Sequence, residues 1–148
     1  MEIEHEKPAD HYLYCFSVDY RIRLFADFRA NACVVITNQD EFKRRLLSAA
    51  RKAMPKWYLE IGMAKYIDPY FVLQLLPNTG AEILFFKHLR FFYQNEWRLV
   101  ALPPPNCHGP EGPLYLKLGD MRDISQLIVL RGNPFARQAE VPSCGAKK

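Results

Sequence analysis

The segment over residues 32–55 constrains the fold most, because a strand signal and a helix signal follow each other across one short turn. Ala32–Ile36 is an apolar run rich in β-branched residues, which predicts a strand buried on both faces. Asn38 stands three residues before Glu41, the spacing of a capping box, and predicts a helix that begins there. Pro55 ends this helix after residue 54, because the residue before a proline avoids the helical region.

The expected helix over 38–54 is amphipathic. Apolar residues recur along one of its faces: Phe42, Leu46, Ala49, Ala50 and Ala53. The opposite face carries four cations: Lys43, Arg44, Arg51 and Lys52. Because short basic runs are common on solvated helix faces, we interpret this face as solvated and rank nucleic-acid binding through Lys43–Lys52 third among three functions.

Four other segments have strand patterns: His11–Ser17, Trp57–Tyr66, Glu96–Leu102 and Ile124–Leu130. Gly62 interrupts the second of them and predicts a bulge. A further strand is expected at Leu114–Leu118, so that the Pro/Gly-rich stretch at 103–113 would connect two antiparallel neighbours. Residues 18–29 fit a short helix or a strand, and we favour a helix or turn. Residues 71–76 fit either, and 81–87 predict a short helix.

These elements predict an α+β fold, with a mixed or antiparallel sheet and one clear amphipathic helix. A chain of 148 residues can bury one core without disulfides or metals. We expect a single domain over 11–131, between a polar N-terminal arm at 1–10 and a loose C-terminal tail at 132–148.

Composition narrows the class of protein. Hydrophobic residues make up 49% and charged residues 24%, as in globular chains. No run approaches the ~18 apolar residues of a membrane span, and the charged start resembles no signal peptide. We therefore predict a cytoplasmic protein without a membrane partner. The 4 Cys and 4 His lack a zinc-ligand spacing such as CxxC, so no metal is expected.

The segment Gln94–Arg98, which reads Gln-Asn-Glu-Trp-Arg, is the best candidate for chemistry. Alternate residues of a strand share a face, so Glu96 and Arg98 are expected side by side, about 6 to 7 Å apart at Cα. One interpretation is a structural ion pair on a half-exposed sheet face. The other places Glu96 in a cleft, oriented by Arg98 and hydrogen-bonded by Gln94, where the carboxylate stabilises a cationic centre.

The spacing Gln94-x-Glu96 resembles the Gln/Glu-x-Glu signature of ADP-ribosyltransferases, and Tyr14-Cys15-Phe16-Ser17 resembles the aromatic strand ending in Ser or Thr of that family. This resemblance implies an NAD-dependent transferase in which Glu96 stabilises the ribosyl cation and Gln94 orients the substrate. Because arginine suits phosphate groups, the candidates for contact with the cofactor are Ser17, Arg21 and Arg23.

Over a longer span, the chain resembles a bacterial family of small cytosolic proteins that has no settled activity. The resemblance rests on Ser17, Ala32–Ile36, Phe42–Arg45, Tyr93–Arg98 and Leu116–Ile124. A third class of function is a non-enzymatic interaction protein from a mobile element or a defence locus. Such a protein would use an aromatic surface to bind a protein partner or a second copy of itself. We rank this binding function first and the transferase nearly level with it.

Overall fold

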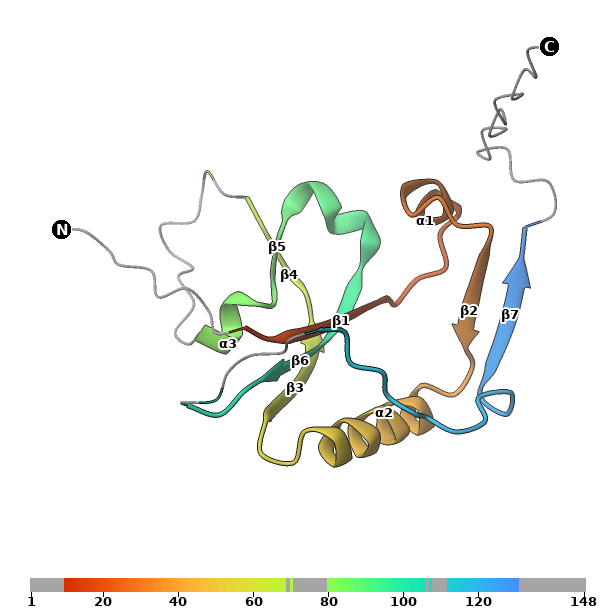
Figure 1. Cartoon of the computed structure of the whole chain (residues 1–148). Coiled ribbons are helices and arrows are strands. Elements are labelled where there is room, and N and C mark those ends of the chain that lie inside the picture. Colours follow the sequence, from red (N-terminus) through yellow and green to blue (C-terminus); the bar gives the residue numbers. More distant parts are fainter. Residues whose placement is uncertain (1–9, 69, 71–79, 106, 108–111, 131–148) are drawn as a thin grey trace, which may run out of the picture.

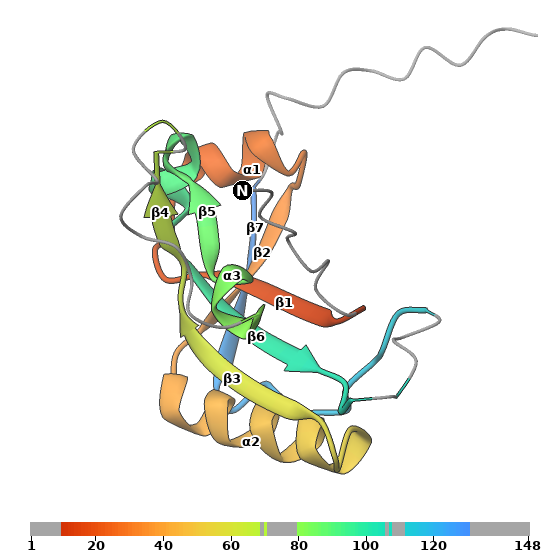
Figure 2. The same cartoon turned by 90° about the vertical axis from the view of Figure 1, so that its left-hand side faces the viewer.

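The computed structural model describes most of the chain, namely residues 10–68, 70, 80–105, 107 and 112–130. Its centre is a three-stranded antiparallel sheet in the order β1-β6-β3, made of β1 (Tyr12–Ser17), β6 (Glu96–Leu102) and β3 (Tyr58–Met63). Helix α2 (Gln39–Ala53) lies against one face of this sheet, with β3 running along it (Figures 1 and 2). The predicted α+β class is confirmed.

The opposite face of the sheet carries a smaller layer (Figure 2). It contains α3 (Gly80–Ile83) and a parallel pair of short strands, β4 (Lys65–Ile67) and β5 (Phe86–His88). The 3₁₀ helix η2 (Leu89–Gln94) follows β5 and leads directly into β6. The first residues of β6 are therefore enclosed between two layers.

Two further strands form a separate antiparallel ribbon, β2 (Ala32–Ile36) with β7 (Ser125–Val129). Figure 1 shows β2 on the side of the ribbon nearer the central sheet and β7 on the outside. Helix α1 (Ile22–Asp27) connects β1 to this ribbon. Arg45 of α2 ties the ribbon to the helix layer, because its guanidinium donates to the Asp123 carboxylate at 2.5 Å.

The core lies between α2 and the sheet. Phe42, Leu46 and Ala50 repeat along one helix face and pack against Leu99 and Ala101 of β6. The cap predicted at the start of the helix is present, since the Asn38 side chain accepts from the Glu41 N–H at 3.1 Å. The return half of the capping box is replaced, because the Glu41 carboxylate binds Arg44 and Arg45.

Three details of the strand predictions are wrong. The segment at 57–66 is two strands rather than one, and Gly62 forms no bulge but pairs in register with Arg98. A Cβ at this glycine would lie 3.1 Å from the Phe85 ring, so close packing accounts for the glycine. Residues 114–118 form no strand, because Leu116 and Leu118 pack onto the core as irregular chain.

Two other predictions need correction. The strand Ala32–Ile36 is not buried on both faces, since the Val34 residue is 59% exposed and its partner Leu127 is 65% exposed. A ribbon of two strands leaves this face uncovered by the described chain. The helix expected over 81–87 ends at Ile83, and Phe86–His88 pairs with β4 instead. The segments at 1–9, 71–76 and 132–148 lie outside the described residues.

Candidate functional site

The pairing of β1 with β6 brings the predicted site residues together from distant parts of the chain. Ser17 ends β1 directly opposite Glu96, the first residue of β6. Gln94 is the last residue of η2, and Arg98 lies two residues along β6, on the same face as Glu96. The predicted neighbourhood of Glu96, Gln94, Arg98 and Ser17 therefore exists in the fold.

Asn95 shapes the junction between η2 and β6. Its φ of 41° lies in the left-handed region, which asparagine tolerates better than most residues. The Asn95 carbonyl accepts from the Val18 N–H at 2.9 Å, and its amide donates to Asp19 at 3.1 Å. This turn lets Gln94 and Glu96 direct their side chains to one buried region, where Lys87 donates to both.

Glu96 is bound by two cations at once. One carboxylate oxygen accepts from Arg98 Nε at 3.0 Å, and the other accepts from the Lys87 ammonium. Lys87 also donates to the Gln94 side-chain oxygen at 2.5 Å. The Arg98 guanidinium donates further to the backbone oxygens of Leu84 and Phe86. Each charge in this network is thus paired and hydrogen-bonded, as a buried ion must be to persist.

The surroundings of Glu96 leave its carboxylate enclosed. Its backbone N–H donates to the Tyr66 hydroxyl at 2.8 Å, and burial raises the pKa of that phenol. Glu96 and Arg98 have almost no solvent contact, at 7% and 6% exposure, whereas the Lys87 side chain is 19% exposed. This arrangement fits the structural ion pair anticipated for Glu96 and Arg98, although the pair is buried rather than half-exposed.

The three predicted cofactor contacts have other partners. The Ser17 hydroxyl donates to the backbone oxygen of Gln94 at 2.7 Å. Arg21 forms an ion pair with Asp19 at 3.0 Å. The Arg23 guanidinium lies 3.6 Å from the centre of the Tyr93 ring and beside Asp27. Ser17 and Arg21 line a common cavity, whereas Arg23 does not.

That cavity is an open groove of about 620 Å³ between β1, α1 and β2. Its floor is aromatic: Phe16 packs edge-on against Phe42 at 5.6 Å and against Trp97 at 5.7 Å between ring centres. Phe28, at 67% exposure, stands on its rim. The described residues that line the groove do not include Gln94, Glu96 or Arg98. The groove and the buried ion network are therefore separate sites. We name this cavity the aromatic groove.

The aromatic groove has one unneutralised cation among its described lining residues. Asp19 and Arg21 neutralise each other at the rim. Lys43 instead lies over the floor, with its ammonium 3.6 Å from the centre of the Trp97 ring. A cation–π contact supplies no counter-charge, so Lys43 lacks an anionic partner among the described residues that line the groove.

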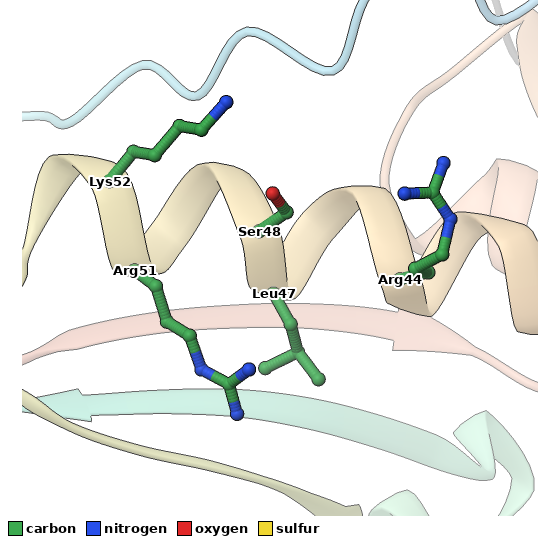
Figure 3. Close-up of a pocket in the computed structure, with 5 residues that line it drawn as sticks. All are labelled: Arg44, Leu47, Ser48, Arg51 and Lys52. Carbon is green, nitrogen blue, oxygen red and sulfur yellow. The ribbon is translucent and has the colours of Figure 1, made fainter.

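The basic face of α2 forms a second concavity, of about 520 Å³ (Figure 3). Figure 3 shows Arg51 and Lys52 leaving the helix in different directions, so they do not converge on one anion. Arg44 is paired with Glu41 at 2.6 Å. The pairing of Arg44 and the divergence of the other two cations fit a solvated helix face.

Comparisons with family models, with curated proteins and with solved structures gave no match to this chain. Among the described residues, no group of three or more His, Cys, Asp and Glu side chains is placed to hold a metal ion. No helix in the described part of the chain has the length and apolarity needed to cross a membrane.

Sequence reasoning missed Lys87 and the aromatic groove. Lys87 stands nine residues before Glu96 and belongs to no motif, and it lies in β5, where it pairs with Tyr66 of β4. The sequence did indicate the strands that carry the aromatic floor of the groove. Phe16 and Trp97 each sit in a strand pattern, but their meeting depends on the register of β1 on β6.

Proposed function

We infer that this chain is a protein-binding protein, which accepts an apolar segment of a partner in the aromatic groove. The single observation that carries the proposal is the groove itself, because it combines a volume of about 620 Å³ with an aromatic floor and an exposed aromatic rim. Pockets of ~300–1,000 Å³ with mostly apolar linings are typical of ligand sites. Aromatic side chains contribute much of the binding energy at protein interfaces.

The surroundings of Glu96 support a binding function rather than a transferase. A catalytic carboxylate needs access to the reacting atoms. Glu96 is 7% exposed and engaged by Lys87 and Arg98. NAD-dependent transfer through Glu96 stays a prediction from the resemblance, and it would require this network to open.

A peptide selection on the full-length protein tests the proposal. Random peptides displayed on phage are selected on the wild-type chain and then measured by fluorescence polarisation against Phe28→Ser and Phe92→Ser. These phenylalanines are equally exposed, at 67% and 66%, but only Phe28 lines the groove. We expect Phe28→Ser to weaken binding at least tenfold, the effect of losing about 1.4 kcal/mol of apolar contact.

The control variant Phe92→Ser should bind the selected peptides as the wild type does. The proposal is wrong if the selection yields no peptides, or if the selected peptides bind the Phe28 and Phe92 variants equally.

A further inference from the structure

The pairing of β2 with β7 determines which backbone groups of β2 are free. The Leu130 N–H donates to the Asn31 oxygen, and the Thr37 N–H donates to the Ile124 oxygen, both at 2.8 Å. In the observed register these are directly opposed residues at the two ends of the ribbon. In an antiparallel ladder, hydrogen-bonded pairs alternate with non-bonded pairs. Between Asn31 and Thr37, the bonded residues are therefore Cys33 and Val35.

The alternate residues Ala32, Val34 and Ile36 direct their N–H and C=O groups away from β7. Among the described strands, β2 pairs with β7 alone, so this second edge has no strand beside it. This edge presents a short row of backbone donors and acceptors that no described strand pairs with. Such an edge is a template for pairing with another extended chain.

The open edge of β2 borders the aromatic groove. All five residues of the strand, Ala32–Ile36, line the cavity. Successive side chains of a strand point to opposite faces, so a cavity that touches all five must run along the edge of the strand. Figure 1 agrees, because β2 is the strand of the ribbon nearer the central sheet.

We propose that the partner binds as an extended peptide that adds a strand to the open edge of β2 and places a carboxylate side chain against Lys43. The proposal rests on the binding function inferred above and specifies its mode. Main-chain hydrogen bonds to Ala32, Val34 and Ile36 align the peptide. Alternate apolar side chains of the peptide then reach the floor of the groove, as in other cases of strand addition.

Charge complementarity selects the acidic peptide. Arg21 is already neutralised by Asp19, which leaves Lys43 as the unpaired cation of the groove among the described residues. Its ammonium is held over Trp97, so a carboxylate that approaches along β2 meets a fixed partner. A basic side chain at the same place would meet repulsion.

The test modifies the peptide, so the protein stays in its wild-type form. Each backbone nitrogen of the tightest peptide from the selection is methylated in turn, and its single acidic residue is changed to the matching amide. Strand addition requires peptide N–H groups at every second residue. We expect methylation to weaken binding at least tenfold at alternate positions and little between them. The peptide that carries the amide should bind the wild-type protein more weakly than the original peptide does. The two peptides should bind Lys43→Met equally.

A protein variant provides an independent readout. Val34→Pro removes an outward N–H and leaves the hydrogen bonds of Cys33 and Val35 to β7, and proline is tolerated at such edge positions. Val34→Ala is the matched control, because it shortens the side chain and keeps the N–H. We expect the proline variant to bind the selected peptide at least tenfold more weakly than the alanine variant.

The possible failures can be told apart. Selected peptides that depend on Phe28 but tolerate methylation at every position would overturn strand addition and leave the binding function standing. Selected peptides without an acidic residue would overturn the role of Lys43. So would an amide-substituted peptide that binds Lys43→Met more weakly than the original peptide does. A selection that yields no Phe28-dependent peptide rejects both proposals.

Discussion

At the residue scale, the charge on Glu96 is compensated by two neighbouring cations. Its side chain is 9% exposed, and those of Arg98 and Lys87 are 8% and 19% exposed. Removing ions from water costs several kcal/mol each, which is recovered only if the geometry and the hydrogen bonds are complete. Arg98 satisfies this condition through the carboxylate and two backbone oxygens. Loss of the Glu96 charge then leaves Arg98 and Lys87 without the carboxylate that they share.

Glu96→Gln should therefore lower the free energy of unfolding by about 3 kcal/mol. The glutamine keeps the shape of the side chain, so the loss measures the missing charge beside Arg98 and Lys87. Urea unfolding of the wild type and the variant gives this value. Arg122→Gln is the control, because its ion pair with Asp120 is exposed and its removal should leave the unfolding curve unchanged. Equal curves for Glu96→Gln and the wild type would contradict a stabilising role for the network.

Only part of this network could be predicted from the sequence. Glu96 and Arg98 lie two residues apart in a strand pattern, and strand periodicity alone places them side by side. The residue that completes the network, Lys87, arrives through the pairing of two three-residue strands. Pairing between such short segments depends on the layers around them, which no local pattern encodes.

At the element scale, the start of α2 depends on one carboxylate. Glu41 binds Arg44 and Arg45, and Arg45 continues to Asp123 in the loop before β7. The hydrogen bonds from Arg44 and Arg45 lower the pKa of Glu41 to about 2. Because the pKa of Glu41 is lower in the folded state, this group stabilises the fold at pH values above its ordinary pKa of 4.5. The contribution disappears as the pH falls from 4.5 towards 2.

The melting temperature should reveal this dependence. We expect Glu41→Gln to melt below the wild type at pH 6, and the difference to close as the pH falls from 4.5 towards 2, which scanning calorimetry can follow. Asp40 lies in the same helical turn and has no ion pair to a described residue. The variant Asp40→Asn therefore controls for the loss of a negative charge near the helix N-terminus. A difference between Glu41→Gln and the wild type that persists unchanged at pH 2 would contradict the assignment.

The elements themselves were largely predictable, because each has a local signal. The cap at Asn38, the break at Pro55 and the apolar run at Ala32–Ile36 all have their expected structures. The sequence did not predict how neighbouring elements cover them. A run of apolar residues indicates a strand but not how many strands join it, so the exposure of Val34 was missed. Leu114–Leu118 shows the converse, since apolar side chains can pack on a core without strand geometry.

At the scale of the whole molecule, the ribbon of β2 and β7 is the most exposed apolar region of the sheets. Val34, Leu127 and Val129 share one of its faces, and each is more than half exposed. The strand β7 has no charged residue, and charges are a common protection of exposed strands. We therefore expect the protein to self-associate through this face as its concentration rises.

Leu127→Lys should keep the chain monomeric at concentrations where the wild type associates, as measured by sedimentation velocity. When two molecules associate through this face, the introduced lysines would approach each other and lose their hydration, which opposes association. Ile22→Lys is the matched control, because Ile22 is also 65% exposed but lies on α1. Association that is identical in the two variants would place the contact elsewhere.

The strand pairings also set the order in which the chain can fold during synthesis. Tyr12 pairs with Ala101, and Ala32 pairs with Val129. Each early strand is therefore made roughly 90 residues before its partner, and at ~5–20 residues per second it waits on the order of 5 to 20 s. Over that interval β1 and β2 lack the strands that pair with them in the native fold. We therefore expect chaperones to bind the nascent chain most while the first strand of each pair has been synthesised and its partner strand has not.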